Sequence, residues 1–181
     1  MQSNNTMFHR LINFIMSKFN VNTHRHDPYK SFKFRVIWDG KVIAGVSRVS
    51  GLNRITEVVD YREGGESSNL SNAPGATLFE PITLERGVTH DPEFERWANL
   101  VFSIQGDAAV SLKNYRKDII IQLLNLQGTV VMAFHVYRCW VSEYQPISDL
   151  DAMSNSLAME RLVLQHDGWE RDQAVSEPQE T

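Results

Sequence analysis

Residues 27–51 constrain the fold of this chain more strongly than any other stretch. Between positions 32 and 38, aromatic and aliphatic side chains alternate with other residues, the period-two pattern of a β-strand with one buried face. Asp39-Gly40 follows at once, and this dipeptide favours a two-residue hairpin turn because both positions tolerate positive φ. Residues 41–49 are then predicted to return as the second strand. We therefore expect an antiparallel sheet that starts from this hairpin.

Further segments show strand character and are expected to extend the same sheet. They are residues 53–61, 81–87, 117–126, 129–144 and 155–168. Residues 117–126 and 129–144 are predicted to form a second long hairpin across Gln127-Gly128. Much of the segment at 117–126 is apolar on both faces, which indicates central burial. Residues 67–75 are predicted to be a loop, because they are rich in Ser and Asn and end in Pro74-Gly75.

One helix is predicted between these strands. Thr89 or Asp91 can cap its start, Pro92 suits the first helical position, and Glu93 and Glu95 lie where the helix dipole favours anions. Its apolar stripe, which would pack on a sheet or close a barrel end, consists of Phe94, Trp97, Ala98, Val101 and Phe102. Together these elements predict a mainly β fold, an antiparallel β-barrel or sandwich with one packed α-helix.

The composition excludes several classes of protein. The chain has 181 residues, enough for one domain with its own core, and its 42% apolar and 22% charged content is typical of a soluble globular protein. A net charge of −4 argues against a general nucleic-acid or anionic-membrane binder. No stretch approaches the roughly 18 apolar residues of a membrane span. The single cysteine, Cys139, lies in an apolar strand pattern and is expected to be a small buried residue.

The chain is expected to divide into an N-terminal extension at residues 1–26, a domain at 27–171 and a loose C-terminal tail at 172–181. Within the extension, residues 7–19 carry apolar side chains at a helical period, interrupted by basic residues. Three interpretations stay open for this segment: a short amphipathic helix docked on the body or a neighbour, a membrane-surface anchor, or a poorly ordered leader.

Candidate reactive residues do not assemble into a recognisable site. His24 and His26 lack a third metal ligand at a supporting spacing and are expected to lie in a solvated loop. His90 is not accompanied by any nucleophile or metalloprotease motif. Glu93 and Glu95 are two positions apart on the predicted helix, so they point in different directions and cannot act as a carboxylate pair. The sequence predicts no catalytic, cofactor-binding or metal-binding residues.

The segment from Val58 to Glu66 has two competing interpretations. As a phosphate-binding loop, it would use the paired glycines at 64 and 65, but no helix start follows and acidic residues crowd the segment. As an extended β-arm, it would project and pair with another subunit.

Six motifs in chain order carry a resemblance to a known family. They are DPYxxFxFxV at 27–36, VSGL at 49–52, YREGG at 61–65, ITLERG at 82–87, the acidic helix start with Trp97, and a terminal strand at 157–168. This series resembles the inner tail-tube protein of contractile phages and extracellular contractile injection systems, and it covers most of residues 27–171. No single motif is specific, but their order is.

The resemblance implies a structural protein that does no chemistry. Members of the family form hexameric rings stacked into a tube, enclosed by a contractile sheath and ending on a baseplate. Sheath contraction drives the tube through a target membrane without stable membrane insertion. The resemblance implies assembly in the cytoplasm and a final place in a phage tail or a released, extracellular injection particle, with DNA or a protein effector as a possible cargo in the lumen. The alternative is a non-enzymatic β-barrel binding module or a ring protein like that of type VI secretion.

On this resemblance the residues of interest are contact residues, and the β-arm interpretation is favoured. The inter-subunit arm consists of Val58, Val59, Asp60, Tyr61, Arg62, Glu63, Gly64, Gly65 and Glu66, with Arg62 and Glu63 as candidate ion-pair formers. Candidates for lumen or subunit contacts are Lys33, Arg35, Gln122, Glu160 and Arg161.

Overall fold

A computed structural model of the chain describes residues 29–61, 71–102 and 114–176. The chain divides into two units, residues 1–30 and 31–181, and the second holds every described strand and helix. Of the first unit, only Tyr29 and Lys30 are described, and they lie outside regular structure. The predicted segment at 7–19, the two histidines at 24 and 26, and the arm tip at 62–66 lie outside the described residues.

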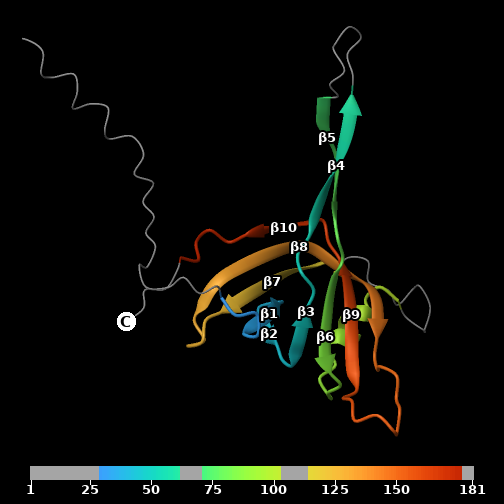
Figure 1. Ribbon diagram of the computed structural model, residues 1–181. Helices are drawn as coiled ribbons and strands as arrows, with labels where there is room; N and C mark the ends of the chain where they lie inside the picture. Colours follow the sequence, from blue (N-terminus) through green and yellow to red (C-terminus); the bar gives the residue numbers. More distant parts are fainter. Residues whose placement is uncertain (1–28, 62–70, 103–113, 177–181) are drawn as a thin grey trace, which may run out of the picture. The chain divides into compact units, whose positions relative to one another are not determined.

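The described elements are ten strands and one short helix (Figure 1). They are β1 (Phe34–Trp38), β2 (Lys41–Ile43), β3 (Val46–Val49), β4 (Arg54–Tyr61), β5 (Ser71–Phe79), β6 (Ile82–Gly87), α1 (Glu93–Ala98), β7 (Lys117–Leu124), β8 (Val130–Gln145), β9 (Met159–Gln165) and β10 (Gly168–Arg171).

Eight strands form one antiparallel sheet in the order β2-β1-β7-β8-β9-β6-β3, and β10 also pairs with β8. The sheet folds into two layers, one of β2, β1, β7 and β10 and the other of β9, β6 and β3. Strand β8 joins the two layers because its first half pairs with β7 and its second half with β9. The change of partner falls near Arg138, which has a φ of 56° and whose amide N–H donates to the Asp118 carboxylate. The mainly β fold is confirmed in its sandwich form. No ladder joins β2 to β3 within the described strands, so the sheet does not close into a barrel.

The first predicted hairpin is confirmed at its turn, but its second strand is shorter than expected. Asp39 and Gly40 both have positive φ, 51° and 72°, as the Asp-Gly turn requires. The predicted continuous strand at 41–49 is wrong, because the chain turns at Gly45, whose φ is 78°. Residues before this turn form β2 and pair with β1, whereas residues after it form β3 and pair with β6.

Strands β4 and β5 pair only with each other among the described strands, as a two-stranded antiparallel ribbon. The predicted loop at 67–75 is therefore wrong from Ser71 onward, where β5 begins. Pro74 is tolerated because it lies opposite Val58, beside a bulge in a ribbon whose outer edges are free. Strand β5 lacks an alternating apolar face because it covers no core of its own subunit, so its sequence gives no periodic signal.

The core lies between the two layers and is closed by α1, which packs against β8. Trp38 contacts both aromatic residues of the helix, with ring centroids 5.8 Å from Phe94 and 4.9 Å from Trp97. The predicted helix is confirmed but ends at Ala98, so the predicted stripe is too long and Phe102 is exposed. Cys139 is fully buried, as expected.

The last predicted strand, at 155–168, is confirmed only over Met159–Gln165, because residues 155–158 lie outside regular structure. Residues 155–168 contribute β9, and the chain continues into β10 along the same edge of β8. Asp172, the first residue of the predicted tail, donates its amide N–H to the Ala133 carbonyl, and its carboxylate lies 3.3 Å from His135 Nε2. Hydrogen bonds from the Ala174 amide and from His135 lower the pKa of the Asp172 carboxyl.

Candidate functional site

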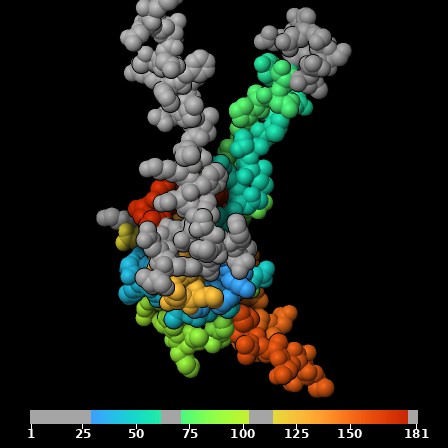
Figure 2. All heavy atoms as spheres, turned by 60° about the vertical axis from the view of Figure 1, so that its left-hand side comes forward, coloured from blue at the N-terminus to red at the C-terminus, as the bar shows by residue number. Residues whose placement is uncertain are grey.

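The β4–β5 ribbon, which we call the arm, exposes large apolar side chains on both of its strands. All eight residues of β4 are exposed. Five large apolar residues of the arm are 45–66% exposed: Ile55, Val58, Val59, Tyr61 and Leu78. On the face shown in Figure 2, no other described residues cover the arm. Exposed apolar strands with open edges are normally suppressed in monomers because they pair with other chains.

The two arm strands fit closely despite this exposure. Thr56 and Thr77 face each other across the ribbon, with hydroxyl oxygens 3.0 Å apart. Gly75 lies beneath Val59, and a Cβ at Gly75 would come within 2.9 Å of Val59 Cγ2 and 3.2 Å of Glu57 Cβ. The arm is therefore a formed hairpin rather than an irregular loop.

The base of the arm is fixed to the sandwich. The Glu80 amide N–H donates to the Asn53 carbonyl at 3.2 Å, which closes the two arm strands where they leave the sheet. The Phe79 ring lies 5.6 Å from the His166 ring, and it also lies against Gly168, where a Cβ would approach it to 3.3 Å. These contacts attach the arm to the turn between β9 and β10.

The described part of the predicted arm, Val58 to Tyr61, lies in β4. Among the other predicted residues, Arg35 and Gln122 are brought together as cross-strand neighbours on β1 and β7. Arg35 Nε donates to Gln122 Oε1 at 2.6 Å. Lys33 donates to the Leu126 carbonyl at the β7–β8 turn.

The last two candidates are adjacent on β9 and have different surroundings. Arg161 pairs with Glu143 on β8 and is half-buried. Glu160 is only 5% exposed. Its contacts lie within the subunit, so a partner subunit is not needed to neutralise it.

Glu160 belongs to a buried ion-pair network around Arg86, whose side chain is fully buried. Arg86 Nε donates to Glu160 Oε2 at 2.6 Å, and the same guanidinium donates to the main-chain oxygen of Asp91 at 2.6 Å. The guanidinium also lies over the Phe94 ring, 4.1 Å from its centroid. The network therefore joins β6, β9 and the start of α1, whose Glu93 amide N–H is accepted by Asp91 Oδ1 at 3.1 Å.

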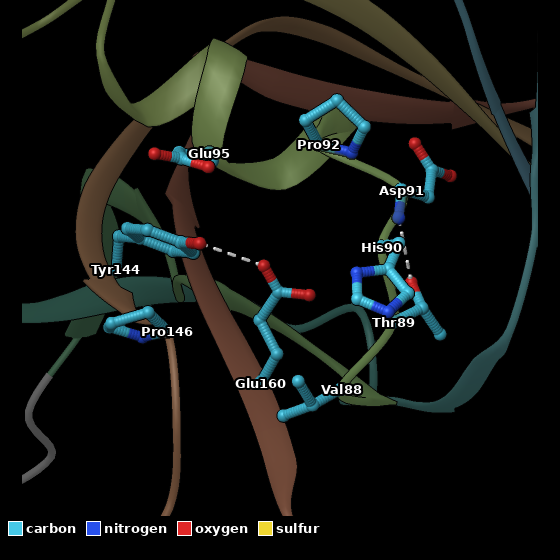
Figure 3. Close-up of a pocket in the computed structure, with 9 residues that line it drawn as sticks. All are labelled: Val88, Thr89, His90, Asp91, Pro92, Glu95, Tyr144, Pro146 and Glu160. Atoms are coloured by element: carbon cyan, nitrogen blue, oxygen red, sulfur yellow. Dashed lines mark hydrogen bonds between the residues drawn. The ribbon is translucent and has the colours of Figure 1, made fainter.

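A pocket of about 310 Å³ adjoins this network and is lined by Val88, Thr89, His90, Asp91, Pro92, Glu95, Tyr144, Pro146 and Glu160 (Figure 3). Tyr144 points to Glu160, and its hydroxyl donates to Glu160 Oε1 at 2.8 Å (Figure 3). Burial, together with this hydrogen bond and the nearby negative charge of Glu160, raises the pKa of Tyr144. Both carboxylate oxygens of Glu160 are thus occupied by donors, which suits a structural role.

Sequence reasoning missed Arg86 and Tyr144 as partners of Glu160. A signal for the arginine was present: Ile82, Leu84 and Arg86 occupy one buried face of β6, and Glu160 takes an equivalent place on β9. A single charge in an otherwise apolar strand face on each of two paired strands indicates a buried ion pair, once the register Arg86↔Glu160 is known.

Two further observations concern sites of other kinds. Within the described residues, no group of three or more His, Cys, Asp and Glu side chains could hold a metal ion. The same part of the chain contains no helix long and apolar enough to cross a membrane.

Comparison with protein families identifies the class of the chain. The family model described as T4-like virus tail tube protein gp19 matches residues 30–170. The chain belongs to this family. The family resemblance noted in the sequence is confirmed, and so is the function class: this tail tube protein is a structural tube subunit. No curated protein sequence matches the chain.

Solved structures agree with the family. The tail tube protein is similar to a chain of the PVC sheath–tube complex, an extracellular contractile injection system in its extended state, with 29% identity and a TM-score of 0.67 over 81% of this chain and 93% of that one. It is 27% identical to a chain of the PVC sheath/tube terminator, with the same TM-score over 81% and 97%. The fold also matches a chain of the anti-feeding prophage tube-terminating cap, with 24% identity and a TM-score of 0.69 over 87% and 99%.

Proposed function

We propose that this tail tube protein forms hexameric rings that stack into the inner tube of a contractile tail or injection particle. The observation that carries the proposal is the arm. Its exposed apolar residues and its open strand edges are unfavourable in an isolated subunit and are satisfied when another copy covers them. A contact between two different surfaces of one chain closes into a ring when the rotation permits, and it extends along an axis when rings stack.

The predicted residues take roles on this proposal. The predicted inter-subunit segment, Val58 to Glu66, contacts an adjacent subunit or ring, with Arg62 and Glu63 as ion-pair formers. Lys33, Arg35, Gln122 and Arg161 are placed at the lumen or at subunit contacts. The burial of Glu160 favours a role inside the subunit instead, where it fixes the start of α1 through Arg86.

The similar proteins belong to assemblies with a sheath, a baseplate and a cap, and they support the partners proposed for this subunit. A sheath encloses the tube, a baseplate holds its end, and contraction of the sheath drives the tube through a target membrane. Subunits assemble in the cytoplasm before they become part of the phage tail or the released particle, and DNA or a protein effector passes through the lumen. The subunit itself catalyses no reaction: its buried carboxylate, Glu160, is neutralised by Arg86 and bound by Tyr144.

Negative-stain electron microscopy with light scattering on the purified protein, over a series of concentrations, tests the proposal. We expect sixfold rings or hollow filaments, and particle mass that rises with concentration. A chain that lacks residues 61–66 is expected to stay folded, because the preceding strand β4 is exposed over its whole length and packs on no core, and it is expected to stack less. A protein that remains monomeric at all concentrations, including with baseplate components present, would contradict the proposal. Normal filaments from the deletion would contradict the role of the arm.

A further inference from the structure

The connection between β8 and β9, residues 146–158, exposes a second set of apolar side chains. Four large apolar residues of this β8–β9 loop are 44–93% exposed: Ile147, Leu150, Met153 and Leu157. Scattered exposed apolar residues are ordinary on a protein surface, but four in one connecting segment form a candidate contact surface.

The loop is held by its own hydrogen bonds. At its base, the Ser148 amide N–H donates to the Met159 carbonyl at 2.8 Å, and the Met159 amide N–H donates to Ser148 Oγ at 3.0 Å. At its tip, Asp151 Oδ1 accepts the Met153 amide N–H at 2.9 Å, and the Asp151 carbonyl accepts the Ser154 amide N–H at 3.1 Å. The turn thus presents the apolar side chains of the loop to solvent in a defined backbone conformation.

The arm and the β8–β9 loop lie at opposite ends of one strand pair. Strand β6 is antiparallel to β9, with Ile82 opposite Leu164 at one end and Gly87 opposite Met159 at the other. The arm enters the sheet through β5 at the Ile82 end, and the loop enters it at the Met159 end (Figure 1). The ladder therefore carries one apolar surface at each of its two ends.

This polarity is what head-to-tail stacking requires. A filament of identical subunits forms when two different, complementary surfaces at opposite ends of the subunit meet. Both surfaces here are apolar, both are exposed in the single chain, and no described residue of the same chain covers either of them. A second copy of the chain supplies each surface with the partner that it lacks.

We infer that the β8–β9 loop of one copy is the docking surface for the arm of a copy in the next ring. The inference rests on the proposed tube function and adds to it the surface that receives the arm. Leu150, Met153 and Leu157 lie against the apolar side chains of the arm, and the contact is dominated by burial of apolar surface.

Site-directed cross-linking tests this contact in the full chain. Two singly substituted proteins, Met153→Cys and Val58→Cys, are mixed, assembled and treated with a short bismaleimide, and covalent dimers are measured on a denaturing gel. Val59→Cys replaces Val58→Cys in a parallel mixture, because the two neighbouring residues point to opposite faces of the arm. Leu126→Cys, at the exposed β7–β8 turn, takes the place of Met153→Cys in the control mixture. The native Cys139 is buried and contributes little background.

We expect dimers from one of the arm cysteines mixed with Met153→Cys, only under conditions where tubes form, and at least tenfold fewer from the Leu126→Cys control. Tubes that form normally without such dimers, or with equal dimers from the control, would overturn the inference and leave the tube function intact. Failure of the unsubstituted protein to form rings or tubes would instead overturn the proposed function and the inference with it.

A double substitution in the β8–β9 loop tests the same contact independently. The pair Leu150→Asp and Met153→Asp places two charges on the loop without touching the core, so the unfolding midpoint is expected to be unchanged. Rings are expected to remain and filaments to shorten at least tenfold in mean length. Filaments of normal length from the double variant would overturn the inference.

Discussion

The Arg86–Glu160 pair allows a quantitative test of how this subunit is held together. Arg86 is fully buried and Glu160 almost so, with 2.6 Å between Nε and Oε2. We propose the substitution Arg86→Met, which keeps much of the aliphatic stem and removes the guanidinium. Glu160 then stays buried with one donor, the Tyr144 hydroxyl, in place of two. Asp91 also loses the donor that holds its main-chain oxygen.

The expected cost follows from the burial of the remaining charge. Removing one partner of a buried ion pair typically costs about 3–5 kcal/mol, because the other charge is left uncompensated in a region of low dielectric. The double variant Arg86→Met, Glu160→Leu removes both charges and is expected to recover much of this loss. It does not recover all of it, since the half-buried Tyr144 hydroxyl loses its acceptor at a cost of about 1 kcal/mol. We therefore expect the double variant to be about 1–2 kcal/mol less stable than the unsubstituted chain.

Urea unfolding followed by tryptophan fluorescence measures these free energies, at a fixed concentration below that at which scattering detects assembly. Trp38 and Trp97 report on the same region, because the Trp38 ring packs against both Trp97 and Phe94, and the guanidinium lies over the Phe94 ring. Arg48→Met is the matched control: Arg48 pairs with Glu85 at 3.3 Å, but its side chain is 72% exposed. Its expected cost is below about 1 kcal/mol. Equal costs for Arg86→Met and Arg48→Met would refute the reasoning.

Two further predictions concern the arm and the core cysteine. Gly75→Ala places a Cβ 2.9 Å from Val59 Cγ2, so the arm must distort. We expect shorter filaments by electron microscopy and an unchanged unfolding midpoint. A lowered midpoint would instead show that Gly75 contributes to the stability of the subunit core. Burial raises the pKa of Cys139 to about 12 from 9.0, so the folded state favours the neutral thiol. The stability that the neutral thiol contributes is complete below pH 9. It is lost as pH rises from 9 toward 12, at about 1.4 kcal/mol per pH unit. Cys139→Ala is expected to reduce the slope of unfolding free energy against pH above pH 9, and an unchanged slope would contradict the burial argument.

The strands that bury one face were predictable from sequence. Strands β1, β6 and β9 lie within the predicted segments, because each packs one face on the shared core and alternates with a period of two. Strand β7 was predictable from an apolar run on both faces instead, which is typical of a central strand. The first turn was predictable for a different reason: Asp39-Gly40 adopts positive φ at both residues, which few other dipeptides tolerate.

Changes of strand partner were not predictable from local pattern. The side chains of residues 41–49 alternate across Gly45, so the sequence shows one strand where the structure has β2 on one partner and β3 on another. A second change of partner occurs near Arg138, where β8 passes from β7 to β9 within what was predicted as one strand at 129–144. Which strands a segment pairs with depends on residues far away in the chain, and local periodicity carries no information on that choice.

Glu160 illustrates the limit for single residues. A glutamate on a strand whose neighbours are apolar was expected to seek a partner in another subunit or the lumen. The residue that occupies it, Arg86, lies 74 positions earlier in the chain and becomes a neighbour only through the register of β6 and β9. The sequence pattern therefore indicated that Glu160 needs a partner, and only the register identified that partner as a residue of the same subunit.

Strand β5 of the arm shows why a surface proposed to serve assembly gives little local sequence signal. Strand β4 lies within the predicted strand at 53–61, whereas β5, most of whose residues are exposed, has the composition of a loop and was predicted as one up to Gly75. Yet Ile55, Val58 and Leu78 are apolar and exposed, and no requirement of the single chain accounts for them. The β8–β9 loop has the same property, with Met153 among the most exposed residues described. The subunit's own fold does not need these apolar residues, and they lie at the two ends of one strand pair. This is the arrangement expected of a protein whose exposed apolar surfaces are covered by neighbouring copies.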